Sequence, residues 1–250
     1  MQSHQSNMKP KICCSIAKLK EFSFEDYPFE GYELKIEEGI KPNIIILLKT
    51  KEIFKGKDLS LHSQLSRIFS CVERGIPEFS EAEINILKSE IIISKIIGIK
   101  QIIFHMRDAP LTKEEIKQFN KIISFAEESG IEMLYENHVC SDKVVLDVLK
   151  KLPKAKFCLD IGHLNVAMNK GEFKMNIKEF LDKVNSKLVS IHAHNNYGEK
   201  DEHNSIEDGN LNWKEILNIL KESNLKKIVI ENRNREDAIK TKTALENFYK

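Results

Sequence analysis

Short apolar runs alternate with amphipathic segments along the chain, and this alternation limits the folds that the chain can adopt. We predict strands in the runs rich in Ile, Val, Leu and Phe, at residues 11–17, 31–37, 58–63, 100–106, 131–138, 156–163, 188–194 and 227–233. Most of these runs are almost continuously apolar, which is typical of parallel strands buried on both faces. The segments between them show helical spacing, as in Ile116, Phe119 and Ile123. The pattern predicts a parallel sheet with helices outside it.

The number of predicted strands and the chain length together favour a closed barrel. Eight strands within 250 residues, without a linker or a low-complexity tract, fit one barrel better than an open sheet. We therefore predict an α/β fold, a single (β/α)8 TIM barrel over residues 11–250. Residues 18–30 leave little room for a helix, so we expect a reduced first βα unit. We expect the polar residues 1–10 to be disordered or to derive from cloning.

Charge and cysteine content argue against several classes of protein. The formal net charge is +1, which gives no support for a strongly basic nucleic-acid binder. The five cysteines have no Cys-x-x-Cys spacing, which argues against a zinc ribbon and a disulfide framework and fits a reducing cytoplasm. No run reaches about 18 uninterrupted apolar residues. No apolar signal segment precedes the first strand, so we expect neither a membrane anchor nor secretion.

Potential metal ligands stand at the ends of the predicted strands from the third strand onward, and in the loop after the seventh. They are His62, His105, Glu136, Asp160, His163, His192, His194, Asp201, His203 and Glu231. All strand C-termini of a (β/α)8 barrel meet at one face, so these side chains are predicted to share one bowl. Histidine and carboxylate ligands without cysteine suit Zn²⁺, Mn²⁺, Co²⁺ or Fe²⁺. One histidine at a strand end is more often structural, but seven of the eight histidines in such places favour a metal site.

These motifs resemble the xylose isomerase-like TIM-barrel superfamily. That superfamily includes sugar phosphate isomerases and epimerases, and apurinic-site endonucleases of the endonuclease IV type. The segments that carry the resemblance are "LSLHSQL", "IIFHM", "LYENH", "LDIGH", "IHAHNN", "DEHNSIEDGNLNW" and "VIENR". The resemblance covers nearly the whole chain. Its motifs are specific for the superfamily and not for one reaction.

The isomerase branch of the superfamily implies one ion, Mn²⁺ or Mg²⁺, and a sugar or sugar-phosphate substrate. The implied ligands are Glu136, Asp160, His192 and Glu231. Glu136 and Glu231 would also be catalytic, moving a proton next to a carbonyl through a metal-stabilised enediolate. The expected substrate contacts are His163, His194, Asn137 and Arg233.

The endonuclease branch implies a cluster of Zn²⁺ ions that cleaves abasic DNA. Its additional ligands would be His62, His105, His163, Asp201 and His203, and all nine positions are present. However, the chain has "HMRDAP" and "ENHVCSD" where these endonucleases have "HPG" and "AGQG". The loop after the seventh strand instead resembles the "HLHDN…DEHLPLGEG" pattern of the isomerases. We therefore place an isomerase or epimerase first, an endonuclease or phosphoesterase second, and a barrel that only binds its ligand third.

Two details of the resemblance leave alternatives open. His192 aligns better than His194 with the His-x-x-Asp of the family, so we expect His192 to bind metal and His194 to contact the substrate or a ligand. Asn195 stands where the isomerase pattern has Asp, so the support of the metal is expected to differ there. The motifs do not fix the substrate, the number of metal ions or the oligomeric state.

Overall fold

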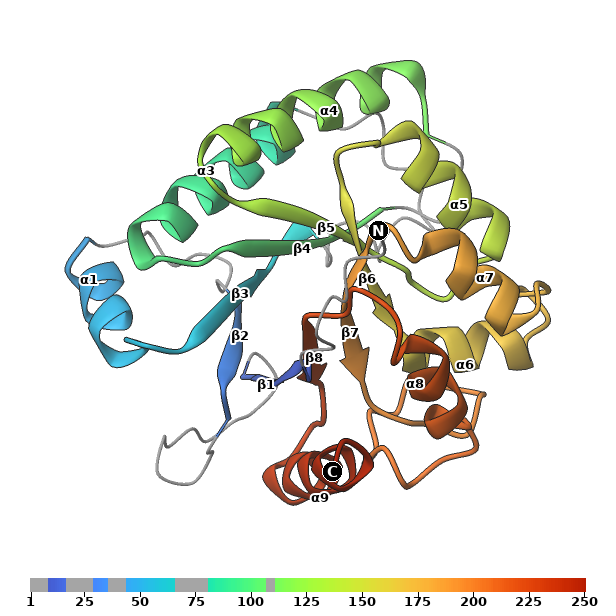
Figure 1. Cartoon of the computed structure of the whole chain (residues 1–250). Coiled ribbons are helices and arrows are strands. Elements are labelled where there is room, and N and C mark those ends of the chain that lie inside the picture. Colours follow the sequence, from blue (N-terminus) through green and yellow to red (C-terminus); the bar gives the residue numbers. More distant parts are fainter. Residues whose placement is uncertain (1–8, 17–28, 36–43, 66–80, 107–110) are drawn as a thin grey trace, which may run out of the picture.

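The protein is a closed barrel of eight parallel strands that follow one another in sequence order (Figure 1). The structure, a computed structural model, describes residues 9–16, 29–35, 44–65, 81–106 and 111–250. The strands are β1 (Lys11–Ser15), β2 (Gly31–Lys35), β3 (Asp58–His62), β4 (Gln101–His105), β5 (Glu132–Glu136), β6 (Lys156–Asp160), β7 (Leu188–Ala193) and β8 (Lys227–Ile230). β1 pairs with both β2 and β8, which closes the barrel. The predicted TIM barrel is therefore confirmed.

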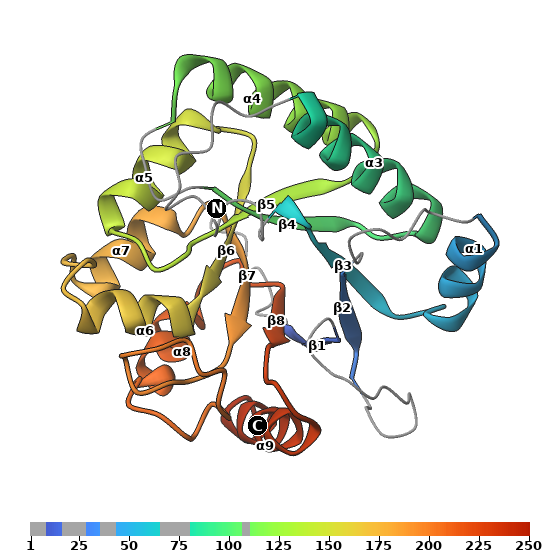
Figure 2. The same cartoon turned by 180° about the vertical axis from the view of Figure 1, so that it is seen from behind.

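The described helices surround the strands, as the two opposite views show (Figures 1 and 2). They are α1 (Ile44–Ile53), α3 (Glu81–Ile97), α4 (Lys113–Glu128), α5 (Asp142–Lys151), α6 (Ile161–Asn169), α7 (Ile177–Val184), α8 (Trp213–Leu220) and α9 (Arg235–Phe248). All of them except α1 bury apolar side chains. The rings of Phe104 in β4 and Phe119 in α4, for example, stack with centroids 5.7 Å apart. The expected reduced unit at 18–30 and the expected disordered residues 1–10 lie mostly outside the described residues.

Alternation along the strands separates two buried layers. Successive side chains of a strand point to opposite sides of the sheet. One set, with Leu59 and Leu61 of β3, belongs to the large core between strands and helices. A smaller cluster, Ile103, Leu134, Cys158 and Val189, is separate from that core and fills the inside of the barrel. The C-terminal ends of the strands lie beyond this interior layer and carry the polar residues.

The N-terminal ends of three strands are joined by an ionic cluster. Asp58 at the start of β3 contacts Lys11 of β1 at 2.7 Å and also pairs with the buried Lys227 of β8. Burial of Asp58 by itself raises its pKa, but the two lysines outweigh burial and lower the pKa below its usual value. The cluster therefore ties β3 to the pair of strands that closes the barrel.

The predicted strand 156–163 is wrong at its C-terminal end. β6 ends at Asp160, and α6 begins at the next residue. The reason is local: the Asp160 carboxylate accepts a hydrogen bond from the backbone N–H of His163 at 2.7 Å and so caps the helix. His163 therefore projects from the first turn of a helix and not from a strand.

Two further expectations concern membranes and cysteines. None of the helices in the described ranges is long and apolar enough to cross a bilayer. Cys13, Cys14, Cys140 and Cys158 are free and buried, whereas Cys71 lies outside the described residues. Location in the cytoplasm stays a prediction.

Candidate metal centre

Histidines and carboxylates gather at the C-terminal ends of the strands. Among the described residues, five overlapping groups have ligand atoms that lie within 4.8 Å of one another. Together these groups contain all nine predicted metal ligands, and also His194 and Glu33. All of these side chains are buried except Asp201, which is partly exposed. The predicted residues thus lie together at one end of the barrel, and their roles as ligands stay a prediction.

Glu136, the last residue of β5, lies at the centre of a first ligand cluster, in which it contacts His62, His105 and His192. Its Oε2 is 2.9 Å from Nε2 of His105 and 3.2 Å from Nε2 of His62. Its Oε1 is 2.9 Å from Nδ1 of His192 on β7. Burial by itself raises the pKa of Glu136, but His105 and His192 lower it well below its usual value. Glu136 is therefore an ionised carboxylate that faces imidazoles with both oxygens.

A second ligand cluster, which joins the ends of β6, β7 and β8, consists of Asp160, His192, His194 and Glu231. His194 Nε2 is 3.1 and 3.2 Å from the two oxygens of Asp160. His192 Nδ1 is 3.8 Å from Oε2 of Glu231 and 4.0 Å from Oδ2 of Asp160. Burial raises the pKa of Asp160, but His163 and His194 more than offset this and lower it. His192 of β7 and His194, one residue beyond the end of β7, thus both contact candidate ligands, because residues two apart in extended chain point to the same side.

A third ligand cluster joins Asp201 and His203, on the loop that follows β7, to His163 of α6. Asp201 Oδ2 is 2.7 Å from Nε2 of His203 and 3.5 Å from Nε2 of His163. His203 has a positive φ of 58°, a region that costs energy for any residue except glycine. Hydrogen bonds hold this conformation: the Asn232 amide donates to the carbonyl of His203 at 3.0 Å. A strained backbone maintained beside Asp201 is typical of a functional site.

Three histidines share an arrangement that is common among metal ligands. The Nδ1 atoms of His62, His163 and His203 lie 3.4, 3.0 and 2.7 Å from the backbone carbonyls of Ser63, Asn137 and Glu231, respectively. A carbonyl can only accept, so each Nδ1 carries a proton and each Nε2 is directed at a carboxylate. Metal-bound histidines usually donate their second ring N–H in this way.

The donor set fits a divalent metal ion. Within the described part of the chain, Oε2 of Glu136, Oδ1 of Asp201 and Nδ1 of His194 are buried without a hydrogen-bond partner. A neutral imidazole with its lone pair toward a carboxylate oxygen places two acceptors opposite each other, which a cation between them would stabilise. Nitrogen and oxygen donors without thiolate suit Zn²⁺, Mn²⁺ or Mg²⁺, with Zn²⁺ favoured where histidines dominate.

The histidines differ in how they respond to these surroundings. Burial lowers the pKa of His163, but Asp160 and Asp201 outweigh burial and raise it to about 10. Burial is the main influence on His105, and its pKa is lowered even though Glu136 is adjacent. His105 is therefore neutral at pH 7 and can offer a lone pair, whereas His163 must lose a proton to do so.

The expected substrate contacts lie beside the candidate metal ligands. The Asn137 amide donates to the Asp160 carbonyl at 3.0 Å and accepts from the Asp160 N–H at 2.9 Å, so it fixes the end of β6. Arg233 donates to the Asp201 carbonyl at 2.8 Å and supports the loop after β7. His163 and His194 face Asp160 and Asp201. Contact of these four residues with a substrate stays a prediction.

Asn195 supports the loop and not a ligand directly. Its amide donates to the carbonyl of Ile206 at 2.8 Å and accepts from the N–H groups of Asn196 and Leu211 at 2.9 and 3.2 Å. An aspartate at this position would lack the donor that reaches Ile206. The departure from the isomerase pattern is therefore matched by the hydrogen bonds of this loop.

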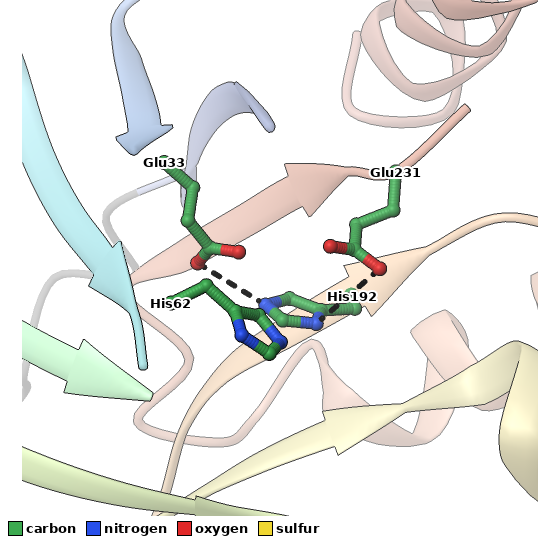
Figure 3. A group of neighbouring side chains, drawn as sticks. All are labelled: Glu33, His62, His192 and Glu231. Carbon is green, nitrogen blue, oxygen red and sulfur yellow. Dashed lines mark hydrogen bonds and ion pairs between the residues drawn. The ribbon is translucent and has the colours of Figure 1, made fainter. Parts of the chain in front are cut away.

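Sequence reasoning missed Glu33, which lies in the middle of β2. It is fully buried, and Oε2 is 3.3 Å from Nε2 of His192 (Figure 3). Ligands were predicted at strand ends and in the loop after the seventh strand, whereas Glu33 is in mid-strand. The signal was present in "GYELK", where Tyr32 and Leu34 flank a glutamate that alternation directs to the opposite side.

Comparison with known proteins agrees with this architecture. A family model described as "Xylose isomerase-like TIM barrel" matches residues 49–248. The uncharacterized protein MJ1311 of Methanocaldococcus jannaschii is 33% identical over 139 residues, which are 52% of this chain and 46% of that protein. The chain thus spans about half the length of the curated relatives it matches.

Two solved structures have the same fold at low sequence identity. A D-tagatose 3-epimerase-like protein is 24% identical with a TM-score of 0.75, and the match covers 96% of this chain and 97% of that one. An IolI protein with a bound zinc atom is 15% identical with a TM-score of 0.72, over 95% and 97% of the two chains. With the family model matching most of its length, the chain belongs to the xylose isomerase-like TIM-barrel family.

Proposed function

We propose that the chain is a divalent-metal-dependent isomerase or epimerase of a sugar or sugar phosphate. The observation that carries this proposal is the placement of two glutamates around one imidazole. Glu136 and Glu231 lie 2.9 and 3.8 Å from Nδ1 of His192 and come from different strand ends. Two carboxylates that approach one position from different strands supply the pair of bases that epimerisation requires. The name of the similar D-tagatose 3-epimerase-like protein is consistent with this class.

The residues that would hold the ion are Glu136, Asp160, His192 and Glu231. When bound, Mn²⁺, Mg²⁺ or Zn²⁺ supplies Lewis-acid polarisation of the carbonyl and hydroxyl oxygens of the substrate. Glu231 would remove the proton from the carbon next to the carbonyl and, as the carboxylic acid, would return it to the neighbouring carbon in an isomerisation. In an epimerisation Glu136 would instead protonate the other face with a proton taken up from solvent, and Glu231 would release the proton that it removed. His163 and His194 bind the hydroxyl groups and keep the sugar in place. Burial of these side chains excludes water from the reacting carbon.

Solvent exchange tests this reaction class. Purified protein loaded with Mn²⁺ or Zn²⁺ is incubated in ²H₂O with a panel of ketoses and their phosphates. We expect a deuteron at the carbon next to the carbonyl, together with the isomer or epimer. Absence of both exchange and product formation with every sugar, in protein that holds its metal, would contradict the proposal.

The third ligand cluster, Asp201 and His203 with His163, supports a second candidate, a zinc-dependent apurinic-site endonuclease or phosphoesterase. Asp201 and His203 add a set beyond the four residues that one ion needs, and His62 and His105 add another. Metal analysis separates the two candidates. About three zinc ions per chain with cleavage of abasic duplex DNA would overturn the isomerase proposal. Neither stoichiometric metal nor turnover would leave a barrel that only binds its ligand.

A further inference from the structure

We infer that Glu33 is a positioning residue of the metal centre, which holds the His192 ring so that Nδ1 is its metal-binding atom. This inference rests on the proposed metal site, but it is independent of the reaction that the site catalyses. It concerns a residue outside the ligand set of the sequence motifs. It also decides between the two nitrogens of His192.

The two nitrogens of His192 have different surroundings (Figure 3). Nδ1 is directed toward candidate ligands, 2.9 Å from Glu136 and 3.8 Å from Glu231. Nε2 lies on the other side of the ring, 3.3 Å from Oε2 of Glu33. A histidine that binds metal through one nitrogen commonly donates its other ring N–H to a carboxylate, which fixes the tautomer and makes the ligand more basic. Glu33 occupies the place of that carboxylate.

The surroundings of Glu33 fit a supporting role. The Ser60 hydroxyl donates to the same Oε2 at 3.2 Å, so this oxygen lies within reach of both a hydroxyl donor and Nε2 of His192. Strand register pairs Glu33 with Ser15 on β1 and with Ser60 on β3. Small side chains on both neighbouring strands leave room for the carboxylate inside the barrel. The same register pairs Lys35 with His62, so Glu33 lies two residues below the level of His62 and deeper in the barrel.

The competing possibility is that Glu33 binds an ion itself. Glu33, His62, His192 and Glu231 have ligand atoms within 4.8 Å of one another, so the distances permit it. In that case Nε2 of His192 would be the metal-binding atom and would carry no proton. The position of the proton on the His192 ring therefore distinguishes the two roles.

Nuclear magnetic resonance of the zinc-loaded wild-type protein tests this directly. Histidine is labelled with ¹⁵N, and the His192 signals are assigned by comparison with His192→Asn. We expect Nε2 to carry a proton and Nδ1 to show the shift of a metal-bound nitrogen. A metal-bound Nε2 would overturn the inference and make Glu33 a ligand.

A variant tests whether the contact matters for metal binding. Glu33→Gln keeps the size of the side chain but removes its charge, and Glu115→Gln is the control, since Glu115 is also buried but binds the backbone of Thr112. Zinc affinity is measured by competition with a chromophoric chelator. We expect Glu33→Gln to weaken zinc binding about 10- to 100-fold. We expect Glu115→Gln to leave the affinity within about twofold of wild type, since supporting contacts act on the ligand that they touch.

The outcomes separate this inference from the proposed function. Wild-type protein that binds no zinc, Mn²⁺ or Mg²⁺ contradicts the proposed function. Wild-type protein that binds zinc while Glu33→Gln binds it equally well contradicts only the role of Glu33. Thermal unfolding of the metal-free variants shows whether a loss of zinc affinity reflects misfolding. If it does, the ¹⁵N spectrum of the zinc-loaded wild-type protein alone tests the role of Glu33.

Discussion

Glu231 lies one residue beyond β8, where its carboxylate faces His192 and its backbone carbonyl accepts from His203 at 2.7 Å. Glu231→Gln removes the carboxylate but retains the main-chain contact. We expect turnover in the solvent-exchange assay to fall below detection, because the base is lost, while the fold is kept. Circular dichroism and thermal unfolding check the fold. Activity near that of wild type would refute Glu231 as the base.

The positions of the predicted ligands at strand ends follow from the sequence only because the fold is regular. Asp160, His192 and Glu231 stand at strand ends, and a (β/α)8 barrel brings such ends to one face. Glu33 is in mid-strand, and its depth depends on how the strands are staggered. Spacing along the chain does not reveal stagger, so the contact between Glu33 and His192 required the structure.

At the scale of one element, α6 combines a helix cap with a candidate ligand. Asp160→Asn retains an oxygen that can accept from the His163 N–H, since Asn and Asp are comparable N-caps. The change of cap alone should alter the free energy of unfolding of the metal-free protein by less than about 1 kcal/mol, and loss of the buried charge that faces the protonated His163 should lower it further. Metal binding is expected to be lost, because the charge is lost. Urea unfolding and metal analysis check the two halves of this prediction, and a fully loaded variant would show that Asp160 is no ligand.

The first turn of α6 also needs a glycine. A Cβ at Gly162 would collide with the His194 ring, although this glycine has an ordinary helical backbone. We expect Gly162→Ala to destabilise the protein by about 1–3 kcal/mol, as for other overpacked sites, and to displace His194 from Asp160. Thermal unfolding and zinc affinity measure the effect. Gly171→Ala is a matched control for residue type, because no atom lies within 4 Å of its added Cβ, although its φ of 70° carries a backbone cost of its own.

The end of β6 illustrates what local sequence could not decide. "KFCLDIGH" is apolar enough to continue as a strand, and the aspartate is both a plausible strand residue and a good N-cap. A tertiary contact adds to the local cap, since the Asn137 amide binds both backbone groups of Asp160 at the point where the strand ends. The sequence predicted the existence of this element and not its boundary.

Over the whole molecule, the ionic cluster of Asp58, Lys11 and Lys227 lies at the end of the barrel opposite the candidate metal ligands. A change in this cluster is therefore expected to affect stability and not metal binding. Asp58→Asn leaves Lys227 buried without its counter-charge, so we expect a loss of about 2 kcal/mol in the free energy of unfolding at pH 7. The pKa of Asp58 is lower in the folded than in the unfolded protein, where it is about 3.9. This contribution is therefore present above that pH and is lost as the pH falls through the folded-state pKa.

Urea unfolding of wild type and Asp58→Asn at pH 7, 5 and 3 measures this dependence. The difference between the two proteins should shrink toward pH 3. Asp147→Asn is the control, since Asp147 pairs with Lys151 at 2.7 Å on an exposed surface. We expect the control to change stability by less than about 1 kcal/mol. A difference for Asp58→Asn that persists at low pH would contradict this account, and metal affinity should be unaffected by either change.

The fold as a whole was predictable because its signal is repeated. Each strand needs only to be recognised as buried on both faces, and an error at one boundary does not alter the topology. The site was less predictable, because its chemistry depends on individual distances between side chains and no repeated sequence pattern encodes them. His192 and His194 both face candidate ligands, and only the surroundings of their ring nitrogens distinguish them.

Closure of the barrel has a consequence for the order of events during protein synthesis. Glu33 and His192 are separated by 159 residues, and β8 must pair with β1 before Glu231 reaches its place. At ribosomal rates of about 5–20 residues per second, roughly 8–30 s pass between the appearance of the two side chains. During that interval the carboxylate of Glu33 lacks the His192 ring as its hydrogen-bond partner. The four proposed ligands Glu136, Asp160, His192 and Glu231 come together only at the last step, so uptake of metal by this set would report that the final strand has been inserted.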